Sequence, residues 1–281
     1  MRRVRRLLDI VAALLREPRA SVVYLSSLPE AMRGLAVSRD WKTRHAAGGA
    51  PTGRPEPAAA SANPLMTYVD QVGAGPGLWK WRHYLDIYHR HLSKFVGTPV
   101  QVVEVGVYSG GSLRMWKHYF GAHCRLSGID IQPACREYED ASTAIYIGDQ
   151  QDRAFWRHFR AQVPAVDVLI DDGGHRPEQQ MVTLEEMLPH LRPGGVYICE
   201  DIHGAGNRFA SFTHSIAAGL NTFRDDASRD VLAAVPTAFQ AAVGSVHVYP
   251  FAVVIEKTEH VVEAFQAPKH GTAWQPFLSL E

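Results

Sequence analysis

From residue 65 onward, short apolar runs alternate with stretches in which apolar residues recur at helical spacing. The apolar runs predict strands over residues 100–105, 124–129, 144–147, 166–170 and 196–199. Helical spacing predicts helices over residues 79–95, 112–120, 133–141, 151–161 and 177–191. Near-continuous apolar strands that alternate with helices indicate a parallel sheet covered on both faces. Two further runs, 245–251 and 252–257, follow each other almost directly and predict an antiparallel hairpin.

These elements predict an α/β domain over residues 65–281, with a Rossmann-like, doubly wound sheet of seven strands whose last strand is antiparallel. Residues 46–64 contain little but Ala, Gly, Pro and Ser, which favours a linker or a loop. Residues 1–45 are expected to form a helical arm, because apolar residues recur at helical spacing from Val4 to Leu15 and Pro18 ends that helix. Its early arginines leave three roles open: docking on the domain or on a second subunit, contact with a membrane surface, or a transit peptide.

Composition argues against two classes of protein, those that bind nucleic acid and those that span a membrane. Lys+Arg and Asp+Glu both number 29, so the net charge is zero and nucleic-acid binding through phosphate neutralisation is not expected. No stretch approaches the ~18 consecutive apolar residues of a membrane span, so an integral membrane protein is not expected either. The three cysteines lack C-x-x-C spacing, which disfavours a disulfide framework and a zinc site and predicts a cytoplasmic protein.

The first predicted strand runs into a glycine-containing loop directly before a helix, Glu104-Val-Gly106-Val-Tyr-Ser109-Gly110-Gly-Ser112. Glycines there let a ligand approach the backbone, and the helix N-terminus offers free N–H donors. Asp130 ends the second strand, where a carboxylate can accept both hydroxyls of a ribose; alternatively, it caps the turn before Pro133. Together the two features favour an adenosine-containing cofactor. The spacing differs from G-x-G-x-x-G, which disfavours a nicotinamide-dependent oxidoreductase.

Acidic residues and histidines follow the next two strands. The fourth strand runs into Asp171-Asp172-Gly-Gly-His175, and the fifth into Glu200-Asp201-Ile-His203. Neighbouring parallel strands would bring Asp172, Glu200 and Asp201 together. Three carboxylates at close range need a cation, and their hard oxygens favour Mg²⁺, although each one alone would also suit a turn or a helix cap. Histidine accepts protons at neutral pH, so His175 is the expected base, with His203 as the alternative.

The opening motif, E-V-G-x-x-x-G, resembles the first motif of class I S-adenosylmethionine-dependent methyltransferases. The resemblance implies S-adenosylmethionine as the cofactor, with Glu104 near its methionine moiety, Gly106 and Gly110 beneath it, and Asp130 on its ribose. It also implies adenine contacts from Asp149 or Gln150. The remaining implied contacts are Ser109, Ser112, Ile131 and Asp171.

Three segments together narrow the resemblance: E-V-G-V…S-L-R-M-W-K-H-Y-F over 104–120, D-D-G-G-H over 171–175, and E-D-I-H over 200–203. They are similar to segments of Mg²⁺-dependent macrolide sugar O-methyltransferases of the mycinamicin type. The similarity covers about residues 65–258 and includes the W-K-W-R-H-Y segment over 79–84. It implies that Mg²⁺ is held by Asp172, Glu200 and Asp201 and that His175 is the catalytic base.

By the same resemblance, the acceptor is a small molecule, a hydroxyl on the sugar of a glycosylated natural product. A phenol, a catechol or a peptide is an alternative acceptor, and a cofactor-binding subunit without chemistry is an alternative function. The first 64 residues differ from the auxiliary domain of the macrolide enzymes. Because the apolar stripe of the first helix is expected to dock, we also expect a homo-oligomer.

Overall fold

The computed structural model of the protein describes residues 2–41, 63–204, 206–222 and 233–271. The chain divides into two compact units, Met1–Ala60 and Ser61–Glu281. The first contains helices α1 (Arg2–Arg16) and α2 (Pro18–Arg39). Pro18 cannot continue the hydrogen bonds of α1 but suits the first turn of α2, which explains the break between them. All but the last two residues of the expected linker, 46–64, lie outside the described residues.

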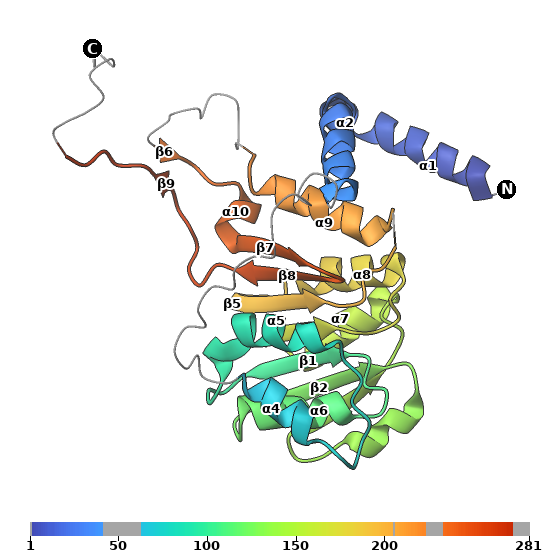
Figure 1. Ribbon diagram of the computed structural model, residues 1–281, viewed down its shortest axis with the longest axis vertical. Helices are drawn as coiled ribbons and strands as arrows, with labels where there is room; N and C mark the ends of the chain where they lie inside the picture. The colour runs from blue at the N-terminus through green and yellow to red at the C-terminus, as the bar shows by residue number, and fades with distance from the viewer. Residues whose placement is uncertain (1, 42–62, 205, 223–232, 272–281) are drawn as a thin grey trace. The chain divides into compact units, whose positions relative to one another are not determined.

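The second unit is built on a seven-stranded sheet with the order β3-β2-β1-β4-β5-β8-β7 (Figure 1). Its strands are β1 (Gln101–Val105), β2 (Arg125–Asp130), β3 (Thr143–Ile147), β4 (Val166–Asp171), β5 (Leu191–Cys199), β7 (Val243–Tyr249) and β8 (Ala252–Lys257). Strands β1 to β5 pair in parallel, whereas β8 is antiparallel to both β5 and β7. This confirms the doubly wound sheet with its antiparallel last strand. A small sheet of β6 (Ala233–Ala234) and β9 (Phe265–Gln266) was not predicted.

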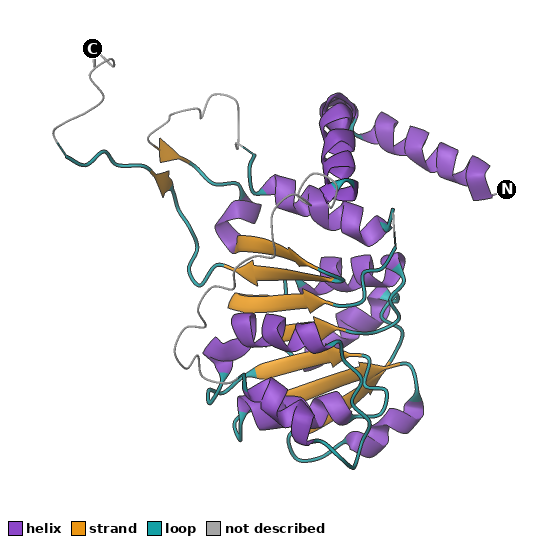
Figure 2. Ribbon diagram, in the orientation of Figure 1, coloured by secondary structure: helices purple, strands orange, loops and turns teal. Residues whose placement is uncertain are grey.

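Helices cover both faces of the large sheet (Figure 2). One face packs against α4 (Pro64–Gln71), α5 (Arg82–Leu92) and α6 (Gly111–Phe120). The other packs against α7 (Arg153–Gln162), α8 (Pro177–Met187) and α9 (Arg208–Gly219). Alternation along β1 sends Val102 into the first layer and Val103 and Val105 into the second. The short elements are η1 (Ser93–Phe95), η2 (Pro133–Tyr138) and α10 (Ala238–Ala242).

The element boundaries differ from the predictions at three places. The helix predicted over 79–95 begins only at Arg82, and 79–81 are not helical. The helix predicted over 133–141 is the 3-10 segment η2. The helix predicted over 177–191 ends at Met187, because Leu191 already pairs with Val166 in the sheet. The register shift that follows this pair lets β5 accommodate the Pro-Gly-Gly sequence at 193–195.

The parallel strands bring the acidic candidate site residues to one edge of the sheet. Asp130 and Asp171 are the last residues of β2 and β4, and Glu200 directly follows β5. In open α/β sheets, ligands bind in the crevice outside these carboxyl ends. Among the described helices, none combines the length and the apolar content needed to cross a membrane.

Candidate active site

The loop between β1 and α6 depends on two glycines with positive φ. Gly106 has φ +92°, and a Cβ at this position would lie 2.1 Å from the carbonyl oxygen of Asp172. The loops after β1 and β4 therefore approach each other more closely than any side chain would allow. Gly110, with φ +70°, is the N-cap of α6 and turns the chain into the helix.

A cavity of about 750 Å³ lies against this loop at the carboxyl ends of the strands. Most of the residues expected to bind cofactor or metal, together with the expected base, line it: Gly106, Ser109, Ser112, Asp130, Ile131, Asp149, Gln150, Asp172, His175, Glu200 and Asp201. Glu104, Gly110 and Asp171 are not among the lining residues. The structure thus gathers the predicted residues around one cavity, with these three supporting it from outside.

Asp130 ties the end of β2 to the glycine loop. Its Oδ2 accepts hydrogen bonds from the backbone N–H groups of Val107 and Tyr108, both at 3.0 Å. Its Oδ1 accepts one from the N–H of Gln132 at 2.9 Å. A carboxylate has about four acceptor positions and three are used here, so the fixed Asp130 side chain can still accept one hydroxyl of a ligand in the cavity.

Asp171 does not line the cavity but supports its wall through hydrogen bonds. Its carboxylate is buried and accepts hydrogen bonds from Gln150 Nε2 at 3.0 Å and from the Tyr197 hydroxyl at 3.2 Å. Burial raises the pKa of Asp171, while these donors act in the opposite direction. Gln150 Oε1 also accepts from the N–H of Gly174 at 2.7 Å. Gln150 therefore fixes the loop that carries His175, a role that sequence reasoning missed.

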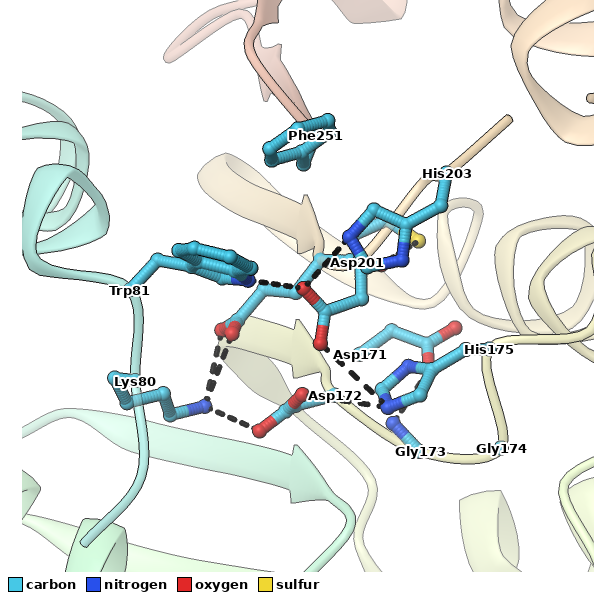
Figure 3. Close-up of polar contacts among 12 residues, drawn as sticks. Lys80, Trp81, Asp171, Asp172, Gly173, Gly174, His175, Asp201, His203 and Phe251 are labelled. Carbon is cyan, nitrogen blue, oxygen red and sulfur yellow. Dashed lines mark hydrogen bonds and ion pairs between the residues drawn. The ribbon is translucent and has the colours of Figure 1, made fainter. Parts of the chain in front are cut away.

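Lys80 places its ammonium group among the carboxylates (Figure 3). Nζ donates to Asp172 Oδ2 at 2.6 Å and to both oxygens of Glu200 at 3.1 Å, and lies 3.5 Å from Glu104 Oε1. The Lys80 and Glu200 side chains are only 4% and 1% exposed. The Tyr88 hydroxyl completes the environment of Glu200 with a hydrogen bond of 2.6 Å. The cation demanded by these acidic residues is thus supplied, in part, by the protein itself.

The charges in this cluster depend on each other. Burial lowers the pKa of Lys80, but Glu200, Asp172 and Glu104 more than compensate, so the net pKa is raised and the ammonium stays charged. Burial raises the pKa of Glu200, and Lys80 opposes that shift. The W-K-W-R-H-Y segment was part of the resemblance, but sequence reasoning gave Lys80 no role. The single signal was a lysine between two tryptophans.

At the mouth of the cavity, Asp172, His175 and Asp201 form a second group, in which one ligand atom of each residue lies within 4.8 Å of the others. His175 Nε2 is 4.0 Å from Asp172 Oδ1 and 3.6 Å from Asp201 Oδ2. Both His175 and Asp201 have φ +54°, a conformation that costs non-glycine residues about 1–3 kcal/mol and that clusters at functional sites. His203 Nε2 lies on the other side of Asp201, at 3.5 Å from Oδ1.

Aromatic side chains form a rim above this group. Trp81 Nε1 donates to Asp201 Oδ1 at 3.0 Å, and the Tyr84 hydroxyl lies at the same distance from that oxygen. Phe251, at the turn between β7 and β8, has its ring centroid 5.7 Å from that of Trp81 and 4.8 Å from that of His203 (Figure 3). The hairpin and the segment before α5 thus meet over Asp201, an arrangement that no motif in the sequence predicted.

Part of this chain is similar to proteins of known activity. Residues 103–202 match a family of methyltransferase domains. Demethylmacrocin O-methyltransferase of Streptomyces fradiae is 35% identical over 122 residues, which cover 41% of this chain and 30% of that protein. The 8-demethyl-8-alpha-L-rhamnosyl tetracenomycin-C 2'-O-methyltransferase of Streptomyces olivaceus is 31% identical over 202 residues, 65% of this chain and 52% of that one.

Among solved structures, MycE methyltransferase from the mycinamycin biosynthetic pathway, in complex with Mg and SAH, superposes with a TM-score of 0.55 at 25% identity. The match covers 64% of this chain and 50% of MycE. This chain therefore spans about half or less of the length of these relatives.

The buried ammonium gives a test of the cluster. Replacing Lys80 by Met should lower the free energy of unfolding by about 3–5 kcal/mol near pH 8, because buried carboxylates lose their cation. The pKa of Glu200 is already raised and should rise further, so its ionised form destabilises the variant as pH increases. The loss should therefore grow as pH rises through about 8, where Glu200 ionises in the wild type, and be smaller below pH ~7, where Glu200 is protonated in both proteins. Urea denaturation at several pH values measures it.

The matched control is Lys117→Met, because Lys117 pairs with Asp140 at the surface. Exposed pairs contribute about 0–1 kcal/mol, so this variant should lose little at any pH. Equal losses in the two variants, without a pH dependence in Lys80→Met, would show that Lys80 does not neutralise the cluster.

Proposed function

We propose, on the premise that residues 103–202 form a methyltransferase domain, that this chain transfers a methyl group from S-adenosylmethionine to a hydroxyl of a sugar. The acceptor would be a glycosylated natural product, and Mg²⁺ would assist. The observation that carries the proposal is that His175, Asp172 and Asp201 converge at the mouth of a cavity that Asp130 also lines. The activities of the relatives, one of which is a methyltransferase for a rhamnosyl tetracenomycin, support a sugar as the acceptor.

The cavity suits S-adenosylmethionine in size and in donor pattern. Its volume of about 750 Å³ falls within the roughly 300–1,000 Å³ of small-molecule sites. Gly106 lines the cavity, and Asp130 presents a carboxylate in the same cavity for a ribose hydroxyl. Asp149 or Gln150 would face the adenine. Glu104 is buried and accepts from Ser112 Oγ at 2.7 Å, so it would support the methionine end from beneath the loop.

The mouth suits a hard divalent ion. Asp172 and Asp201 offer carboxylate oxygens close to each other, and such oxygens are the ligands that Mg²⁺ prefers. Glu200 is the third proposed ligand, but both of its oxygens are hydrogen-bonded to Lys80. Glu200 would therefore have to release Lys80 in order to join the other two. The three carboxylates suit Mg²⁺, but the Lys80 ammonium group competes with the ion for the oxygens of Glu200.

When bound, S-adenosylmethionine supplies an electrophilic methyl group and Mg²⁺ supplies a charge that acidifies the acceptor hydroxyl. The protein's own part is to remove the proton and to hold the reacting oxygen in line. His175 Nε2 would accept that proton, and Asp172 and Asp201 would stabilise the imidazolium that forms. Trp81 fixes Asp201 through its indole N–H, which keeps the carboxylate in place during the transfer.

The proposal is tested by turnover. The full chain should methylate rhamnosylated or other deoxysugar-bearing aglycones when it is supplied with S-adenosylmethionine and Mg²⁺, and mass spectrometry should detect the product. Activity should vanish in EDTA and return with Mg²⁺ in excess. His175→Asn should lower kcat by about 10²–10⁴-fold, the usual contribution of general-base catalysis, whereas His203→Asn should affect it far less.

Calorimetry with S-adenosylhomocysteine is the control, because both histidine variants should bind it like the wild-type protein. Full activity in chelator would contradict the role of Mg²⁺. Activity lost in His203→Asn and retained in His175→Asn would assign the base to His203. Cofactor binding without turnover on sugars, phenols, catechols and peptides would favour a non-catalytic subunit.

Cofactor binding gives a second prediction. Asp130→Ala should weaken S-adenosylhomocysteine binding roughly 10- to 150-fold, because hydrogen bonds to a charged acceptor contribute about 1.5–3 kcal/mol. Calorimetry measures the affinity. Glu263→Ala, which removes an exposed carboxylate outside the cavity, should leave it unchanged. Equal affinity in the wild type and in Asp130→Ala would remove Asp130 from the ribose site.

We also propose a cytoplasmic homo-oligomer. The cysteines Cys124, Cys135 and Cys199 are buried and unpaired, which favours a reducing compartment. Apolar side chains of α1 and α2 are exposed within their unit, among them Leu15, at 76%, and Val22, at 67%. Large exposed apolar surfaces mark interaction sites. Light scattering should therefore show an oligomer that loses subunits when residues 1–45 are deleted, and a monomer in both cases would exclude it.

A further inference from the structure

A second group of metal-ligating side chains lies where α5 packs on the β7–β8 hairpin. His91 comes from the last turn of α5, His247 from β7 and Glu256 from β8. One ligand atom of each residue lies within 4.8 Å of those of the other two. These three residues are not among those that line the cavity. About 15 Å of helix, at 1.5 Å per residue, separates His91 from Trp81 at the cavity rim.

The sheet register brings the group together. Side chains two residues apart on a strand share a face, so Ser245, His247 and Tyr249 point the same way. Ser245 pairs with Glu256 across the hairpin, which places Glu256 on this face too. Val254, on the same side of β8, packs in the apolar layer that α5 covers. The strand alternation and the helix packing therefore aim His91, His247 and Glu256 at one point.

The spacing suits a tetrahedral ion. Zn²⁺ binds imidazole nitrogen and carboxylate oxygen at about 2.0–2.2 Å, so its ligand atoms lie roughly 3.4 Å apart. His91 Nδ1 is 2.9 Å from Glu256 Oε1, and His247 Nε2 is 3.7 Å from Glu256 Oε2. The first separation is shorter and the second longer than the value that the ion requires, and they run to the two different oxygens of the Glu256 carboxylate. Small side-chain adjustments would place all three ligands around one centre.

Neighbouring groups support the same geometry. His91 Nε2 is 2.8 Å from the Tyr249 hydroxyl, which leaves Nδ1 to face the proposed centre. Metal-binding histidines characteristically use their second nitrogen in this way, because that hydrogen bond orients the ring. Ser245 Oγ lies 2.9 Å from His247 Nε2 and 3.3 Å from Glu256 Oε2, so this hydroxyl would have to turn away for those two atoms to reach the ion. His91 is 4% exposed and His247 is 38% exposed, so the group is anchored from within and open to solvent on one side.

We propose that His91, His247 and Glu256 bind one Zn²⁺ ion, which fastens the C-terminal end of α5 to the hairpin. Two imidazoles and one carboxylate are a ligand set that Zn²⁺ accepts with a fourth position left for water. Mg²⁺, which requires hard oxygen ligands in octahedral geometry, is a poor match for two imidazoles. The two centres would therefore take different metals, and the ion on α5 would link the helix to the hairpin.

The test uses Co²⁺ as a spectroscopic probe for Zn²⁺. The full chain, freed of metal by chelation and dialysis, is titrated with Co²⁺ in an excess of Mg²⁺ that competes for the acidic mouth. The visible absorption of tetrahedral Co²⁺ should saturate at one equivalent and disappear when Zn²⁺ is added. His247→Ala should weaken binding at least tenfold, because loss of a ligand costs more than the 10–100-fold that loss of a supporting group costs. Asp172→Asn should retain the spectrum.

Two variants separate loss of the site from loss of the fold. His247 is half-exposed on a strand at the edge of the sheet, and Glu256→Gln keeps the shape of its side chain, so both proteins should keep the wild-type circular dichroism. Weakened Co²⁺ binding in both folded variants supports the site. An unchanged spectrum in His247→Ala overturns it, as does the absence of a tetrahedral spectrum in the wild type. Loss of the spectrum in Asp172→Asn alone would place the ion at the acidic mouth.

Discussion

Buried carboxylates need hydrogen-bond donors, and this need determines the arrangement at the edge of the sheet that carries the candidate site. A parallel sheet brings the carboxyl ends of its strands to one edge, and here acidic residues occupy them. An ionised carboxylate taken out of water costs several kcal/mol unless donors replace the lost solvent. Each buried carboxylate has its own donors, as the hydrogen bonds show: Ser112 and Trp116 for Glu104, Gln150 and Tyr197 for Asp171, Lys80 and Tyr88 for Glu200.

These donors determine how the neighbouring backbone is arranged. Lys80 reaches the acidic residues from a non-helical segment, and α5 begins only at Arg82. The same segment places Trp81 against Asp201. One short stretch thus neutralises the buried carboxylates through Lys80 and forms part of the aromatic rim through Trp81. Gln150 acts similarly on the opposite wall, since it bonds both Asp171 and the loop before His175. The site is therefore held by polar contacts between elements far apart in the sequence.

The sequence predicted what depends on hydrophobic period and strand order. The apolar runs located the strands, and their ends placed Asp130, Asp172 and His175 around one cavity. It did not predict which partner each carboxylate selects, because that depends on side-chain reach across the fold. Lys80 is one example, since it lies far from Glu200 in the chain and no motif showed that its ammonium group would join the acidic residues. The end of α8 is another, because strand pairing at Leu191 overrides a local helical pattern.

Contacts at both ends of α5 connect the end that carries His91 with the candidate active site. At its start, the Tyr84 hydroxyl lies 3.1 Å from the carbonyl oxygen of Phe251, and His83 Nε2 donates to that of Pro250 at 3.0 Å. At its end, His91 bonds Glu256 on the same hairpin. A helix attached to a hairpin at both ends cannot slide or tilt without breaking one of these attachments. The distance between Trp81 and Phe251, which form the rim above Asp201, is thus set jointly by the two ends of α5.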